Sequence, residues 1–308
     1  MSTLFSHFFQ KINTISPLDA NFTEVLSSIV LMTKTLYFYG KIPENVLKNG
    51  KYERPKTVAI VGSRHNTTYG EEVAYKLGFE LAKRGVIIIS GLAYGIDSIG
   101  HRAALDAGGK TIAVLGTPIN EIYPRNHKTL AEEIIKTGGA IISEYAPGAK
   151  VYPKTSFLER NRIISGLSDI VVVVEAAERS GSLNTATHAI NQGKDVYAVP
   201  GDITNPYSRG CNKLIREGAI PYLEPDDILR ELFPEEFIKK QKKLQKANLI
   251  GDTDVETFIL TAIAAGLRSG DEIMNYAKLP PEVFNQSTML LEIKGRIRSL
   301  GASNWALC

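Results

Sequence analysis

Short apolar runs recur through the middle of the chain, from residue 57 to about residue 199. In order they read TVAIV, VIIIS, TIAVL, GAIIS, DIVVVV and DVYAV, and stretches of helical composition separate them. Each run is apolar without alternation, as is typical of a strand buried on both faces of a parallel sheet. The pattern predicts a doubly wound α/β domain, in which ligands bind outside the carboxyl ends of the strands. The predicted strand ends are Val61, Ser90, Leu115, Ser143, Val174 and Val199.

Different patterns flank this region. Residues 1–56 are expected to form a short helical lead-in packed on the sheet, with the apolar and aromatic cluster at 36–39 in the core. The predicted core domain spans 57–233, and a lysine-rich connector at 234–251 is expected to be a basic linker.

Residues 252–308 contain three helical patterns and the candidate strand SNWAL, which together favour a small winged-helix-like domain. Its third helix is expected from about Pro281 to Leu291. This helix carries Glu282, is followed by Glu292, and has no cluster of basic residues before Lys294. Contact with a protein, a degenerate domain without DNA contact, and contact with duplex DNA therefore all stay open for it.

Composition narrows the class of protein. The chain has 308 residues, which favours about two domains, and its 44% hydrophobic and 22% charged residues are typical of an ordinary globular protein. Two cysteines, Cys211 and Cys308, cannot form a disulfide framework or a multi-cysteine zinc site. With no secretory signal and no apolar run long enough to span a bilayer, a cytoplasmic location is expected. The net charge of +3 is too small to identify a partner.

Small residues follow several of the predicted strands, where backbone N–H groups can face a bound phosphate. The candidate phosphate-binding residues are Gly62, Ser63 and Arg64 after the first strand, Ser90 and Gly91 after the second, and Ser180, Gly181 and Ser182 after the fifth. Asp97 is expected to cap the following helix or to pin its loop. Neither G-x-G-x-x-G nor a P-loop motif occurs, so dinucleotide binding is not supported.

The segment 144–168 mixes basic and aromatic residues, a combination that suits a nucleic-acid backbone and a stacked base. These residues are Lys150, Tyr152, Lys154, Phe157, Arg160 and Arg162. Side chains that are two residues apart on a helix point about 200° from each other. Only one of Arg160 and Arg162 can therefore face a given groove. The other is expected to brace the loop or a neighbouring strand. After the sixth strand, Arg209, Asn212 and Lys213 lie within potential reach of the same crevice.

Motifs for catalysis or for a metal are absent from the sequence. The histidines His65, His101, His127 and His188 are scattered without any H-E-x-x-H spacing, and no G-x-S-x-G motif occurs. Cys211 is interpreted as a packing residue. We therefore expect no metal, no cofactor and no enzymatic activity.

Seven segments agree in order and spacing with one known family. They are GSR (62–64), SGLAYGID (90–97), GGKTIAVLG (108–116), YP (123–124), SEYAPG (143–148), FLERNRIISGLS (157–168) and VVEAAERSGSLNTA (173–186). The chain resembles the DNA-processing protein A family of bacterial natural transformation, also called Smf, over about residues 36–222. The resemblance implies an extended Rossmann core that binds single-stranded DNA, protects incoming strands and loads the RecA recombinase, without catalytic turnover. It also implies a homodimer formed largely through the C-terminal helices of the core, here expected within 212–223 and 226–233.

Carried over to this sequence, the family's phosphate-binding arginine matches Arg64, and its stacking aromatic and preceding lysine match Phe157 and Lys154. Its R-N-R trio matches Arg160, Asn161 and Arg162. The sequence departs from the family pattern at Leu158, where many members have a proline that would start a helix, and the stretch before residue 57 is too short for the sterile-alpha-motif-like domain of many members.

Two other functions compete with this interpretation. Phosphoribohydrolases of related fold use P-G-G-x-G-T-x-x-E at the turn where this chain has ERSGSLNTATH, which lacks the catalytic glutamate. A structural scaffold that docks RecA is the third possibility, and it predicts that loss of Arg64 barely changes DNA affinity.

Overall fold

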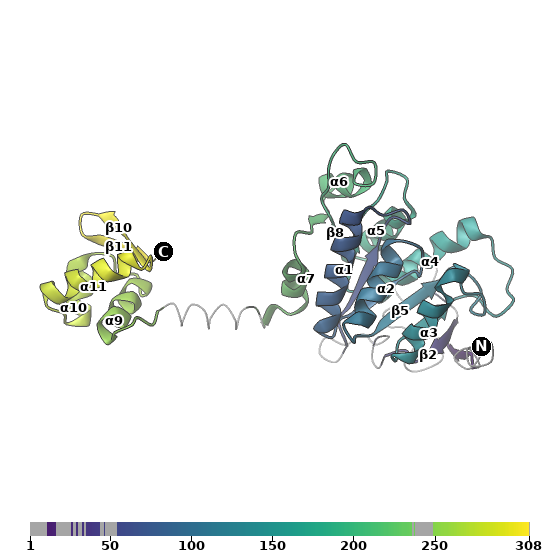
Figure 1. Ribbon diagram of the computed structural model, residues 1–308, viewed down its shortest axis with the longest axis horizontal. Helices are drawn as coiled ribbons and strands as arrows, with labels where there is room; N and C mark the ends of the chain where they lie inside the picture. Colours follow the sequence, from purple (N-terminus) through teal and green to yellow (C-terminus); the bar gives the residue numbers. More distant parts are fainter. Residues whose placement is uncertain are drawn as a thin grey trace. The chain divides into compact units, whose positions relative to one another are not determined.

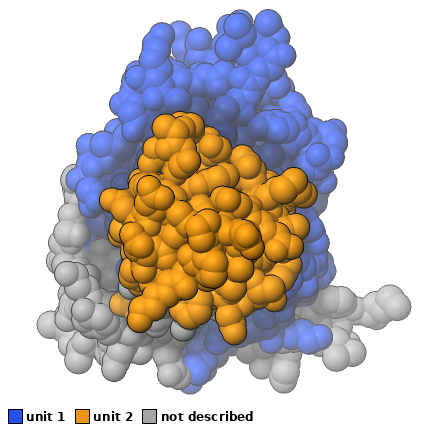
Figure 2. Space-filling model, turned by 90° about the vertical axis from the view of Figure 1, so that its left-hand side faces the viewer, with its two compact units in different colours: residues 1–232 blue, residues 233–308 orange. Residues whose placement is uncertain are grey.

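The protein divides into two compact units, residues 1–232 and residues 233–308, in a computed structural model (Figures 1 and 2). The structure describes residues 11–16, 26, 29, 33, 35–43, 46, 54–235, 237 and 249–307. Most of the predicted basic linker lies outside the described residues.

The first unit is built on a nine-stranded sheet in the order β1-β2-β6-β5-β4-β3-β7-β8-β9. Its strands are β1 (Asn13–Ile15), β2 (Leu36–Gly40), β3 (Thr57–Val61), β4 (Ile87–Ser90), β5 (Thr111–Leu115), β6 (Ala140–Ser143), β7 (Ile170–Val173), β8 (Asp195–Ala198) and β9 (Ile220–Pro221). Strands β3 to β9 pair in parallel, and each predicted strand end is confirmed to within one residue. The predicted Rossmann-like α/β sheet is therefore confirmed.

Helices cover both faces of the sheet. They are α1 (Thr68–Lys83), α2 (Ile96–Asp106), the 3₁₀ turn η1 (Arg125–His127), α3 (Lys128–Lys136), α4 (Pro153–Leu167), α5 (Gly181–Asn191), α6 (Arg209–Arg216) and α7 (Pro225–Leu232). Helices α1, α2 and α3 pack side by side on one face, where Figure 1 shows α1 next to α2. Because parallel crossovers are right-handed, α4 and α5, which return in the opposite direction, cover the other face. No helix within the described part of the chain is long and apolar enough to cross a membrane.

Alternate residues of each central strand enter different layers of the core. In β5, Ile112 and Val114 belong to the cluster that includes α4 and α5, whereas Ala113 and Leu115 pack with α3. All four side chains are at most 2% exposed, which explains why the strands read as unbroken apolar runs.

The N-terminal region differs from its prediction. Leu36–Gly40 is strand β2, which pairs antiparallel with β6, and β1 extends the sheet beyond it. The expected helical lead-in is therefore wrong for these residues, although the expected burial is confirmed for Leu36 and Tyr39. The free edge of β6 accounts for the difference, because an aromatic-rich segment there satisfies its backbone polar groups by adding a strand.

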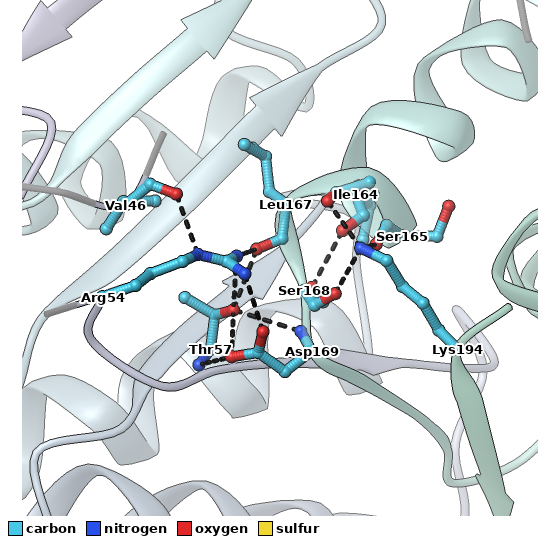
Figure 3. Close-up of polar contacts among 10 residues, drawn as sticks. Val46, Arg54, Thr57, Ile164, Ser165, Leu167, Ser168, Asp169 and Lys194 are labelled. Atoms are coloured by element: carbon cyan, nitrogen blue, oxygen red, sulfur yellow. Dashed lines mark hydrogen bonds and ion pairs between the residues drawn. The ribbon is translucent and has the colours of Figure 1, made fainter. Parts of the chain in front are cut away.

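A polar network joins the end of α4 to the start of β3 (Figure 3). Arg54 donates to Asp169 at 2.7 Å and to the carbonyl oxygen of Leu167 at 2.6 Å, and Asp169 also accepts from the Thr57 amide at 2.8 Å. Lys194 donates to the carbonyl oxygens of residues 165, 166 and 168. These two cations satisfy carbonyl groups that the end of a helix leaves unpaired, so they fix the crossover between α4 and β7.

The second unit contains α9 (Asp254–Ala264), α10 (Gly270–Ala277), α11 (Pro281–Ile293), β10 (Ile297–Gly301) and β11 (Asn304–Leu307). The two strands form an antiparallel hairpin, and a core that includes Ile263, Phe284 and Leu291 joins them to the three helices. Three helices and a hairpin are the expected winged-helix-like arrangement. Lys294 pairs with Asp252 and Glu256 at 2.7 Å, so the basic residue that ends α11 is already neutralised.

Candidate functional site

A pocket of about 510 Å³ lies beyond the carboxyl ends of β3 and β7. These strands are neighbours, but the chain leaves β3 toward β4 on one side and returns to β7 on the other. Such a reversal of strand order opens a crevice between the loops that follow the two strands, where open α/β sheets bind their ligands. The lining includes Gly62, Ser63, Arg64, Phe157, Arg160, Asn161, Ser180, Gly181 and Ser182, which the sequence predicts, and His65, Asp97, Leu158, Arg179 and Tyr207, which it does not.

The turn after β3 is rigid and projects Arg64 outward. A Cβ on Gly62 would lie 2.7 Å from Ile96 Cγ1, so the backbone approach requires glycine there. Thr67, the N-cap of α1, is anchored by Glu175, which accepts from its amide at 2.9 Å and from its hydroxyl at 2.6 Å. Ser63 Oγ accepts from the amide of His65 at 3.0 Å. The turn therefore holds an exposed guanidinium at the mouth of the pocket.

Phe157 forms one wall of the pocket, between two guanidinium groups. Its ring packs so closely on Gly116 that a Cβ there would lie 2.7 Å from Phe157 Cδ1. The guanidinium carbons of Arg64 and Arg160 lie 5.6 and 5.8 Å from the ring centroid, within the range of cation–π attraction. The half-buried ring is thus held in place while its remaining surface stays accessible.

Arg160 forms the floor of the pocket and corrects two of the predicted phosphate contacts. Its buried guanidinium donates to the carbonyl oxygens of Gly91 and Val114, and a Cβ on Gly91 would lie 2.2 Å from Arg160 Nη1. The Gly91 amide donates to Asp97 at 3.0 Å, and the hydroxyl of Ser90 donates to the carbonyl oxygen of Ile60 at 2.6 Å. Ser90 and Gly91 therefore use their polar groups within the fold. The expectation that Asp97 pins the loop is confirmed.

The charge of the pocket favours an anion. Burial lowers the pKa of Arg160 to about 10, so this side chain is still a cation at neutral pH. Burial also raises the pKa of Asp97 above its usual value, although the positive charge of the nearby Arg160 offsets part of this increase. Asp97 is the one acidic side chain among the described lining residues, against the guanidinium groups of Arg64, Arg160 and Arg179. This balance gives the lining a net positive charge.

The third wall is the N-terminus of α5. Ser180 is the N-cap and accepts from the Ser182 amide, and Asn161 donates to the carbonyl oxygen of Gly181 at 3.1 Å. Asn161 thus braces the first turn of α5 against α4. Unpaired amides of a first helical turn attract anions, as the sequence predicted for this turn.

Arg162 lies outside the pocket lining and is a bracing residue. Its guanidinium donates to both carboxylate oxygens of Glu144 at 2.7 Å and to the hydroxyl of Thr33 at 3.2 Å, and Arg162 is 5% exposed. Of the two arginines, Arg160 faces the crevice and Arg162 holds α4 to the end of β6. A direct contact of Arg162 with a ligand is therefore not supported.

Three more predicted contacts also lie outside the pocket lining. Lys154 is exposed in the first turn of α4. Asn212 exchanges two hydrogen bonds with the backbone of Gly201, which fixes the loop after β8, and exposed Lys213 lies 3.7 Å from Glu217. Asn212 is therefore structural, whereas Lys154 and Lys213 are exposed cations that do not belong to the pocket lining.

The lining residues that sequence reasoning missed had different signals. Arg179 directly precedes the Ser180 turn, so its basic character beside a helix N-terminus was available as a signal. No sequence pattern indicates Tyr207 or His65, and only the fold brings them to the pocket lining. Leu158, expected at a helix start, is inside α4, which begins at Pro153 with Tyr152 as its N-cap.

Two groups that could serve catalysis, Cys211 and His101, are engaged within the fold. Burial raises the pKa of the Cys211 thiol to about 12, and the thiol donates to the carbonyl oxygen of Val173. Burial lowers the pKa of His101 to about 3, and Thr111 is its hydrogen-bond partner. The described residues contain no group of three or more potential metal ligands. The catalytic glutamate of the phosphoribohydrolases has no counterpart among the described lining residues, whose one carboxylate, Asp97, is buried.

The fold and this pocket define a Rossmann-like protein with a cationic, aromatic-walled site at the point where strand order reverses. Residues 13–233 match the model of the family described as DNA recombination-mediator protein A. The chain belongs to this family, as the resemblance in its motifs indicated.

The relatives agree with this assignment. The chain is 50% identical over 179 residues to Protein Smf of Escherichia coli strain K12, a match that covers 57% of this chain and 46% of that protein. The match thus spans about half the length of this relative.

Two solved structures are also similar. The X-ray structure of DNA processing protein A from Streptococcus pneumoniae has a TM-score of 0.63 and 40% identity, covering 73% of this chain and 76% of that one. A structure of DNA processing protein A from Helicobacter pylori, described for its single-stranded DNA binding mode, has a TM-score of 0.62 and 31% identity, covering 75% of this chain and 98% of that one.

Proposed function

We propose that this protein is a single-stranded DNA-binding recombination mediator that protects incoming DNA during natural transformation. The observation that carries the proposal is Phe157, an accessible ring fixed between the guanidinium groups of Arg64 and Arg160 at the wall of a net positive pocket. Charge plus an aromatic platform is what an unpaired strand requires, because its phosphates and its base faces are both accessible. The Helicobacter pylori relative, described for its single-stranded DNA binding mode, supports the same ligand.

In the proposed complex a phosphate enters the pocket near Arg64 and the first turn of α5, and a neighbouring base stacks on Phe157. Arg160 lies beneath, with its donors directed at backbone carbonyls, so it supplies charge and holds the ring. A duplex hides the faces of its bases and cannot use this platform. Binding is expected to depend little on sequence, because every base has a face that can stack.

A binding experiment at two salt concentrations tests the proposal. Fluorescence anisotropy is expected to show tighter binding of a single strand than of the matching duplex, and an affinity for the single strand that falls steeply as salt rises. The physical reason is release of roughly 0.7 counterion per neutralised phosphate of a single strand. Equal affinity for both forms, or no dependence on salt, would contradict the proposed site.

The proposed role extends to loading RecA onto the bound strand, in the cytoplasm and without catalytic turnover. Membership of the recombination-mediator family supports it. A mediator needs only to hold the strand and present it, and the one carboxylate of the described pocket lining, Asp97, is buried.

We also propose a homodimer through the end of the first unit. Much of the apolar surface expected in this contact is internal, because Leu214, Tyr222 and Leu229 are buried. Ile220, in the edge strand β9, and Leu223, two residues after it, are 40% and 77% exposed, and they are the exposed large apolar side chains of the two segments expected in the contact. Sedimentation is expected to show a dimer at micromolar concentration that Leu223→Glu weakens, and a monomer of the unaltered protein would refute the proposal.

A further inference from the structure

Two tyrosines that belong to the family-like motifs have no role in the pocket. Tyr94 lies in SGLAYGID and follows β4, and Tyr123 lies in the YP pair and follows β5. Both therefore sit at the edge of the sheet that carries the pocket, since parallel strands end at the same edge. Their exposed fractions are 43% and 48%, although each ring is in contact with another ring.

Tyr123 continues the aromatic wall of the pocket. Its ring centroid lies 5.4 Å from that of Phe157 at an angle of 53°, whereas Arg64 approaches Phe157 at 5.6 Å. Phe157 thus lies in contact with both the guanidinium group and the second ring. An exposed tyrosine held against another ring offers an accessible face at a low cost in side-chain entropy.

Tyr94 is fixed in a similar way on the neighbouring loop. Its ring meets the ring of His127 edge-on at 4.8 Å, and His127 Nδ1 donates to the carbonyl oxygen of Leu92 at 2.8 Å. Leu92 is buried and has a φ of 58°, so the loop that carries Tyr94 has a defined conformation. Arg125, exposed in η1, lies in the sequence between Tyr123 and His127 and adds a cation beside them.

We propose that Phe157, Tyr123 and Tyr94 are stacking platforms for separate bases of one strand, so that the binding track leaves the pocket and runs over the loops that follow β4 and β5. This inference rests on the proposed function and extends it, because the pocket with Phe157 alone accounts for only a short stretch of DNA. Each platform contributes only when the strand is long enough to reach it.

A length series of oligothymidylates tests the track, with affinities measured by fluorescence anisotropy for the unaltered protein and for Tyr123→Ala and Tyr94→Ala. Each variant is expected to lose about fivefold or more in affinity for long strands, since losing one stacked base costs at least that much. Affinity for the shortest strand that binds is expected to stay within about twofold of the unaltered value. Tyr123→Phe and Tyr94→Phe keep the rings and are expected to restore long-strand binding.

Tyr75→Ala is the matched control, because Tyr75 is 39% exposed on α1 and its ring stacks with that of Phe79. Unchanged long-strand affinity in both alanine variants, with tight binding by the unaltered protein, would overturn the track and leave the pocket standing. A loss that the phenylalanine variants fail to restore would also overturn it, because the rings would then not be the reason. No binding by the unaltered protein at any length would instead refute the proposed function.

Discussion

Replacing Arg64 with alanine is expected to lower the affinity for single-stranded DNA by about 10- to 100-fold, equally for all sequences. A hydrogen bond from a charged donor contributes about 1.5–3 kcal/mol, and a tenfold change in affinity corresponds to about 1.4 kcal/mol. The side chain is exposed and its loop is anchored by Thr67 and Glu175, so the loss should come from binding and not from unfolding. Anisotropy titrations at several salt concentrations measure it, and the salt dependence should become shallower by about one phosphate contact.

Arg102→Ala is the matched control for this variant. Arg102 is also a partly exposed arginine, but it pairs with Glu133 on the helical face formed by α2 and α3. The control should bind as the unaltered protein does. Should Arg64→Ala bind normally, the pocket would not be the DNA site, and the scaffold interpretation of the chain would become the better one.

The strands could be predicted from the sequence because the sheet buries both of its faces. A strand such as Thr111–Leu115 has no polar side to interrupt its apolar run, and glycine and serine mark the point where the chain leaves it. Strand β2 was missed because it lies near the edge of the sheet and its five residues alternate only in part, with Leu36 and Tyr39 buried. Whether such a segment becomes a strand depends on the free edge of β6, which lies far away in the sequence.

The site could be predicted by residue type but not by hydrogen-bond partner. Arg64 and the Ser180 turn could be predicted because a loop after a buried strand must lie at the sheet edge, and Phe157 because it lies among the basic residues of 144–168. Ser90 has the same signal, yet its hydroxyl bonds to Ile60 on the neighbouring strand. Gly91 is small because Arg160 fills the space beside it, not because a phosphate approaches. Only the packing of α4 on the sheet distinguishes these cases.

The same packing decides between Arg160 and Arg162. Arg160 lies against Phe157 at the pocket, whereas Arg162 turns toward Glu144 at the end of β6. Both are buried, and a terminal guanidinium nitrogen of each donates to an acceptor within the fold. Of the two arginines that follow Phe157, Arg160 thus belongs to the site, and Arg162 belongs to the surrounding structure that positions α4.

Replacing Arg162 with methionine is therefore expected to destabilise the first unit by about 3–5 kcal/mol while the folded protein keeps its affinity for single-stranded DNA. Removing one partner of a buried ion pair leaves the other charge without compensation, which costs about this much. Here the charge left behind is Glu144, whose side chain is 19% exposed and accepts both bonds from Arg162. Urea denaturation followed by a probe in the first unit measures the change.

The double variant Arg162→Met with Glu144→Gln separates the ion pair from the packing of the side chain. Removing the second charge should recover part of the lost stability, because a neutral amide tolerates burial better than a carboxylate does. Arg64→Ala should show the opposite profile, with weak binding and unchanged stability. If Arg162→Met instead weakened DNA binding as much as Arg64→Ala and left the unfolding midpoint unchanged, the bracing role of Arg162 would be wrong, and its guanidinium would have to leave Glu144 to contact DNA.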